Sequence, residues 1–156
     1  MTQEDVQPAD NVTLILRDEF GNIKHHSIHN QVQTLGKELM ADQMITGAST
    51  TAGPTHAKVS HCAVGTGTGA AVGATVLNGT ELARVALGTK TRSTNVVTFP
   101  ATGANNFPAG TGTGTITEAA LFNASSAGTR AFYASFGAIT KGASDTLDIT
   151  WTLTFP

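Results

Sequence analysis

Residues 146–155 read TLDITWTLTF, and this stretch decides the fold. Its apolar positions alternate strictly with polar ones, which are mostly threonines. A period of two is typical of a β-strand, in which successive side chains point to opposite faces, and it does not fit a helix. We therefore predict a long strand with one face covered by threonines and one buried in the core. The predicted core residues are Leu147, Ile149, Trp151 and Leu153.

Shorter runs of the same alternation occur through the rest of the chain. They predict strands over residues 12–17, 23–29, 58–64, 81–87, 93–99, 116–122 and 130–136. Turn residues separate them, as in Asp-Glu-Phe-Gly-Asn at 18–22, which would close an opening hairpin, and a long connection is expected at 100–108. Short strands at this spacing predict an all-β domain, either an antiparallel β-sandwich or a jelly-roll-like fold.

Two segments depart from the strand pattern. Apolar residues recur at helical spacing over residues 35–44, and Thr34 is suited to cap such a helix, so we predict one short α-helix near residues 34–46. Residues 1–10 are polar and have no periodicity, which predicts an extended N-terminal arm. The predicted organisation is this arm followed by a single β-sandwich domain over residues 11–156.

Composition narrows the classes of partner. Charged residues make up only 13% of the 156-residue chain, and the formal net charge is −2. Such a balance gives no electrostatic attraction to nucleic acid or to an anionic membrane, so we expect neither as a partner. The single cysteine, Cys62, allows no internal disulfide and is expected to be a buried thiol. No long apolar span or signal-peptide pattern is present, which favours synthesis in a cytoplasm.

Glycine-rich runs are the first candidates for a binding site. Gly-Thr-Gly-Thr-Gly occurs at residues 65–69 and again at 110–114. Neither run has the glycine spacing of a nucleotide-binding loop, nor the lysine of a phosphate-binding loop, and no βαβ pattern surrounds them. We interpret both as flexible loops and expect no cofactor.

Histidines are the second candidates. His25, His26 and His29 cluster in one predicted strand, where His25 and His29 would share a face and His26 would point away. His25 and His29 are therefore the candidate metal ligands. We interpret the cluster instead as polar surface or interface histidines, which could titrate near pH 6 and tune a subunit contact. We expect no metal.

Glu81 and Glu118 are the third candidates, because each lies inside an apolar strand pattern. Two carboxylates can act as acid and base in a glycosidase. A sugar-cleaving groove also needs aromatic platforms, and the chain has one Trp and one Tyr. We therefore expect Glu81 and Glu118 to be structural acceptors of hydrogen bonds from the backbone, Arg84 or Arg130, and we expect no catalytic residues. The protein is predicted not to be an enzyme.

Three stretches, in this order, resemble small structural proteins of tailed bacteriophages. They are Ala-Val-Gly-Thr-Gly-Thr at 63–68 leading to Asn-Gly-Thr-Glu-Leu-Ala-Arg at 78–84, Ile-Thr-Glu-Ala-Ala-Leu-Phe-Asn at 116–123, and Lys-Gly-Ala-Ser-Asp-Thr-Leu-Asp-Ile-Thr-Trp at 141–151. The resemblance covers roughly residues 60–155, with a looser likeness in the opening hairpin. The chain resembles head decoration (cement) proteins, and its central strand motif also resembles part of tail-fibre and collar modules.

The resemblance implies a capsid decoration protein, located on the capsid surface of a virion and made in the host cytoplasm. Such a protein would bind the outer surface of the assembled head at subunit junctions and stabilise it. Its implied partners are the major capsid protein and further copies of itself, with a trimer favoured. The alternatives are a tail, baseplate or fibre-attachment structural protein, and a carbohydrate-binding surface module. The scarcity of aromatic residues disfavours the carbohydrate-binding reading.

Overall fold

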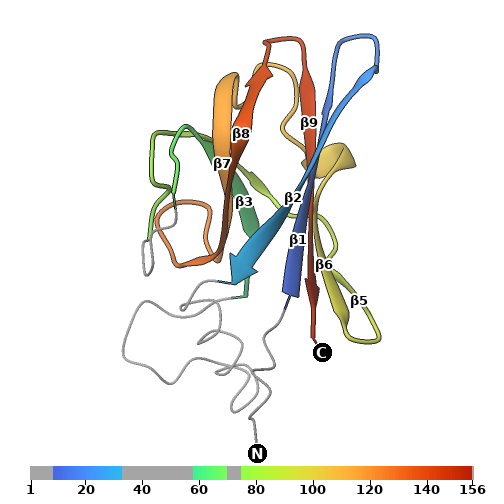
Figure 1. Ribbon diagram of the computed structural model, residues 1–156, viewed down its shortest axis with the longest axis vertical. Helices are drawn as coiled ribbons and strands as arrows, with labels where there is room; N and C mark the ends of the chain where they lie inside the picture. The colour runs from blue at the N-terminus through green and yellow to red at the C-terminus, as the bar shows by residue number, and fades with distance from the viewer. Residues whose placement is uncertain (1–8, 33–57, 70–74, 156) are drawn as a thin grey trace, which may run out of the picture.

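The fold is an all-β sandwich, as the sequence predicts. The computed structural model describes residues 9–32, 58–69 and 75–155, and the side chains of residues 11–23, 58–69 and 75–155. Two antiparallel sheets pack face to face (Figure 1). In the described residues, the one helical element is a single turn of 3-10 helix, η1 (Gly103–Asn105). The α-helix predicted near residues 34–46 and most of the predicted arm lie outside the described residues.

Each sheet has four principal strands in the described part of the chain. Sheet A contains, in spatial order, β2 (Ile23–Val32), β1 (Ala9–Arg17), β9 (Thr146–Thr154) and β6 (Val96–Ala101), with the short β5 (Thr91–Ser93) at its edge. Sheet B contains β4 (Glu81–Ala86), β3 (His61–Gly65), β7 (Gly114–Phe122) and β8 (Arg130–Lys141). The end of β2 joins the two sheets, because Gln31 and Val32 pair with Tyr133 and Phe132 of β8.

The core lies between the two sheets and is built largely on β9. Its four apolar side chains, from Leu147 to Leu153, are at most 3% exposed. Across the core, the ring of Phe132 in β8 lies 6.3 Å from the Trp151 ring. Phe107, from the connection before β7, is also fully buried and exchanges two backbone hydrogen bonds of 3.0 Å with Leu147. Inward-facing side chains of both sheets therefore form one core, as in other aligned sandwiches.

Several strand boundaries differ from the prediction. The run 93–99 is not one strand: β5 ends at Ser93, Thr94 and Asn95 form a turn, and β6 begins at Val96. The sequence has no glycine to mark this turn, because Thr94 occupies its positive-φ position, with φ of 49°. β-branched residues rarely adopt this conformation. β6 and β8 also continue into predicted loops, because their backbones keep pairing as far as Ala101 and Lys141.

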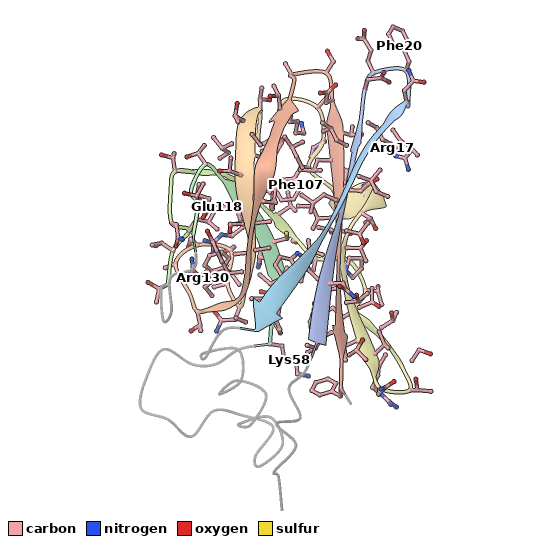
Figure 2. The ribbon with its side chains drawn as sticks, viewed as in Figure 1. Arg17, Phe20, Lys58, Phe107, Glu118 and Arg130 are labelled. Carbon is pink, nitrogen blue, oxygen red and sulfur yellow. The ribbon has the colours of Figure 1, made fainter. Side chains whose placement is uncertain are left out.

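The first hairpin has a well-built tip. β1 begins at Ala9, so the strand includes the last two positions of the predicted arm and pairs there with β9. At the tip, the Asp18 carboxylate accepts hydrogen bonds from the backbone N–H of Phe20 (3.0 Å) and Asn22 (2.8 Å) and from the Asn22 side chain (2.8 Å). Phe20 itself is 81% exposed and lies at the end of the hairpin (Figure 2). The turn therefore presents an aromatic side chain to solvent.

The described residues contain no helix with the length and apolar character that crossing a membrane requires.

Candidate functional site

The outer face of sheet B is covered by the chain's own loops, and we call this region the loop cluster. It contains the face itself, residues 66–69 and 75–80 before β4, and residues 123–129 before β8 (Figure 1, left). A second apolar group is buried there, at most 4% exposed, and consists of Ala63, Leu77, Ala120, Phe122 and Tyr133. Sheet B is therefore buried on both faces over much of its area.

Glu118 lies at the centre of the loop cluster. It is on β7, a strand in the interior of sheet B, and is fully buried. Its Oε1 accepts hydrogen bonds from the backbone N–H of Gly67 (2.6 Å) and Gly79 (2.8 Å), and its Oε2 accepts one from Asn78 (2.8 Å). Bonds from backbone N–H groups to a carboxylate are stronger than neutral ones, and they satisfy a charge that would otherwise be costly to bury. Glu118 therefore anchors two separate loop segments to one strand.

The first Gly-Thr-Gly run makes this anchoring sterically feasible. A Cβ atom at Gly65 would lie 2.7 Å from Glu118 Oε1, and the backbones of Gly67 and Gly79 approach too closely for any side chain. The backbone N–H of Thr66 also donates to Thr80 O at 3.2 Å. Residues 65–67 are thus held in place by hydrogen bonds instead of forming the free loop that the sequence suggests, and their glycines allow close backbone contact.

Asn78 is the second hub of the loop cluster, and sequence reasoning missed it. Its Nδ2 donates to the carbonyl oxygens of Thr68 (3.1 Å) and Gly69 (2.7 Å), and it lies 3.0 Å from the Tyr133 hydroxyl, to which it also donates. A short polar side chain followed by glycine is a strong turn signal, which could have located this loop but not its contacts.

Arg130 is a buried cation of the loop cluster. It is almost fully buried, and its Nη1 donates to Val76 O (2.9 Å) and Asn78 Oδ1 (3.1 Å), while its guanidinium lies 4.3 Å from the centre of the Tyr133 ring. Burial lowers the pKa of Arg130, and Tyr133 and Glu118 oppose that shift. Burial, the Glu118 charge and a hydrogen bond to that carboxylate raise the pKa of Tyr133 to about 12, against the opposing effect of Arg130. The cluster therefore keeps the phenol protonated.

Glu81 is in a different environment from Glu118. It lies on the edge strand β4, with its side chain 34% exposed, and makes a two-pronged ion pair with Arg84 at 2.7 and 3.0 Å. Arg84 Nη1 also donates to the carbonyl oxygens of Ala124 (3.0 Å) and Ala127 (2.9 Å), and its guanidinium lies 3.7 Å from the centre of the Phe122 ring. This pair therefore fastens residues 123–129 to sheet B.

The two glutamates lie in one row of sheet B without forming an acid–base pair. Both are register partners of Gly65, from the strands on either side of β3. Each carboxylate already accepts hydrogen bonds, from the backbone in Glu118 and from Arg84 in Glu81. A general base needs a free position next to a substrate proton, whereas Glu118 is fully buried and both of its oxygens accept backbone hydrogen bonds.

The histidine candidates are placed only by backbone register. His25 and His29 pair with Ile15 and Asn11 of β1, but their side chains lie outside those described. Among the described residues, no group of three His, Cys, Asp or Glu side chains is arranged to hold a metal ion. His61 is described, and its Nδ1 lies 2.8 Å from the Ser60 hydroxyl. Burial lowers the pKa of His61, and the nearby Arg84 and Lys90 add to that shift.

Two further buried groups are structural. Burial raises the pKa of the Cys62 thiol to about 12, with Trp151 and Arg84 opposing, so its reactive thiolate is suppressed. Lys141 is a buried cation that sequence reasoning missed. Its Nζ donates to Pro108 O at 2.9 Å, and burial lowers its pKa while Asp145 opposes the shift. Lys141 therefore attaches the connection that carries Phe107 to the end of β8.

Comparison with known proteins adds no relative. No protein-family model matches the chain, and no curated protein or solved structure shows significant similarity to it. The fold and the loop cluster define only the class of protein, an all-β sandwich in which buried charged side chains hold loops against one sheet.

Proposed function

We propose that this protein is a structural component of a bacteriophage particle, which binds the outer surface of the assembled head at subunit junctions and stabilises it. Its partner is then the major capsid protein, and it acts as a homo-oligomer, for which the resemblance implies a trimer. The observation that carries the proposal is the position of residues from the phage-like motifs, which hold loops against the outer face of sheet B. Gly67, Asn78, Arg84 and Glu118 all come from those motifs, and all of them build the loop cluster.

This use of the motifs favours a structural role. In an enzyme, polar motif residues surround the reacting atoms and leave room for substrate. Here the Glu118 carboxylate binds three backbone N–H groups, and Arg84 binds Glu81 and two loop carbonyls. Side chains used in this way fix the shape of a surface. A preorganised surface loses little conformational entropy on binding, which suits a protein that must dock on a shell.

The hairpin tip supplies a contact residue of the expected kind. Phe20 is an exposed aromatic side chain on a turn that Asp18 holds in shape. Large side chains on ordered backbone contribute a disproportionate share of the binding energy at protein interfaces. Many copies that bind the assembled shell, but not its dispersed subunits, stabilise the shell by mass action.

The carbohydrate-binding alternative loses support from the positions of two aromatic residues. Sugar-binding sites rely on exposed aromatic faces. The single Trp and single Tyr of the chain are Trp151 and Tyr133, and both are at most 3% exposed.

The test is binding to purified heads from particles that lack this protein. We expect the protein to co-sediment with mature heads and to raise the temperature at which they release their genome. Phe20→Ala should weaken binding by roughly tenfold or more, as for an interface hot spot. Phe155→Ala is the matched control, because Phe155 is also an exposed aromatic side chain but follows β9 at the end of sheet A opposite the hairpin tip. Failure to bind heads, with co-purification on tails, would replace this proposal with the tail, baseplate or fibre-attachment role.

A further inference from the structure

The outer face of sheet A differs from every other large surface of the sandwich. We call it the threonine face. On β9 it consists of the polar positions between the buried ones, from Thr146 to Thr154, all of them partly exposed. Strand register continues this face across the sheet: Thr150 pairs with Thr13 of β1 and Pro100 of β6, and Thr152 with Asn11 and Thr98. The pairings of β1 and β6 with β9 contain no register shift, so the face is regular.

The threonine face carries almost no charge. Its described charged side chains are Arg17 and Asp148, and they form an ion pair with Nε and Oδ2 3.7 Å apart. Solvent-facing strands of a soluble domain normally carry lysine and glutamate, whereas the centres of protein interfaces are depleted in them. This face therefore has the composition of a contact surface, since burying it would cost little desolvation of charge.

Other parts of the sandwich are less open to contact. The chain's own loops cover the outer face of sheet B over much of its area. The end strands of the sheets carry charges that oppose the addition of another strand: Arg92 is exposed on β5 and follows the exposed Lys90, and β4 carries the partly exposed Glu81. Charged edge strands are a common means by which proteins prevent edge-to-edge pairing. The threonine face is thus a large surface that the described loops leave open.

We infer that the threonine face is a contact between two copies of this chain, packed face to face around a two-fold axis. Hydroxyl groups both donate and accept hydrogen bonds, so a threonine surface is complementary to an identical copy of itself. Among the described side chains of the face, the Arg17–Asp148 ion pair leaves no net charge to repel that copy. A two-fold contact uses the same patch on both partners, which this self-complementarity satisfies.

The area of the threonine face fits a weak contact. The strands β2, β1 and β9 have nine or ten residues each and β6 has six. At a spacing of about 4.8 Å and a rise of about 3.3 Å per residue, they present roughly 500 Å². Two copies would then bury roughly 1,000 Å² together, the size of weak and transient interfaces. The contact is therefore expected to be reversible and to depend on concentration.

Sedimentation equilibrium of the purified full-length protein tests this inference. We expect a monomer–dimer equilibrium, and we expect Thr150→Lys and Asn11→Lys each to raise the dissociation constant at least tenfold by burying an unpaired charge. Asn11 is exposed on β1, so Asn11→Lys remains informative if Thr150→Lys impairs folding. Thr115→Lys, at an exposed position on β7 of sheet B, is the control and should associate like the unmodified protein.

A monomer at every concentration would overturn the inference. So would a trimer, the assembly that the resemblance implies, or a dimer that both lysine variants leave intact. The measurement uses the protein alone, so its outcome is separate from that of the head-binding test: a protein that dimerises but ignores heads would refute the proposed function and leave this inference standing.

Discussion

Replacement of Glu118 by Gln should lower the free energy of unfolding by about 2–4 kcal/mol. The carboxamide keeps one acceptor oxygen, which can still receive the N–H groups of Gly67 and Gly79 that now bind Oε1. Its NH₂ group then replaces Oε2 and faces the N–H of Asn78, donor against donor. One buried N–H left unsatisfied costs about 1–3 kcal/mol, and the two remaining bonds lose the strength that the charge provides.

Equilibrium urea unfolding, followed by the fluorescence of the single Trp, measures this change. Glu81→Gln is the matched control, because it is the same chemical change at a partly exposed edge position. We expect it to cost at most about 1 kcal/mol, as for other surface ion pairs. Hydrogen exchange adds a local readout, in which the amide protons of Gly67, Asn78 and Gly79 should lose protection in Glu118→Gln alone. Equal stability of the two variants, or unchanged protection of those three amides, would refute the reasoning.

Three further predictions concern the core and the buried titratable groups. Trp151→Ala should cost about 3–5 kcal/mol through the cavity that it leaves, measured by urea unfolding followed by circular dichroism; a cost below about 1 kcal/mol would contradict the described core. Tyr133, the single tyrosine, should ionise only near pH 12 by tyrosinate absorbance. Because its folded pKa is raised above the unfolded value of 10.0, stability should fall as pH rises from about 10 to about 12, and Tyr133→Phe should flatten that fall. Cys62 should react with thiol reagents only as fast as the protein unfolds, and rapid labelling of the native protein would show that it is accessible.

The strands could be predicted where each face of a strand lies in one environment, either core or solvent, along its whole length. On β9 every second side chain is buried in one continuous core. The alternation of apolar and polar residues from Leu147 to Leu153 therefore matches the alternation of buried and partly exposed side chains. The β5–β6 hairpin was not predictable, because its turn places Thr94 at positive φ without a glycine. Turn signals read from composition fail where tertiary contacts hold an unfavourable backbone conformation.

The loop cluster was predictable only in part. An acidic residue in an apolar strand must find hydrogen-bond donors, and that reasoning led to Glu118. Its donors could not be foreseen, since Gly67 and Gly79 are 51 and 39 residues away in the chain and come from loops positioned by packing. The same reasoning predicted for Glu81 the same role as for Glu118, a structural acceptor of hydrogen bonds. The two differ because β7 is inside sheet B and β4 is at its edge, a distinction that strand order decides.

The position of β9 has a consequence for how the chain folds as it is synthesised. This strand lies between β1 and β6, although β1 comes first in the chain and β9 last among the strands described. Until residues 146–154 have left the ribosome, β1 and β6 have no strand between them and the apolar side of sheet A has a gap at its centre. The nascent chain must therefore hold β1 and β6 apart, or in non-native contacts, until Thr154 has left the ribosome. Non-local pairing of this kind slows folding and exposes unpaired edges, so the newly made chain is most vulnerable to aggregation just before its last strand emerges.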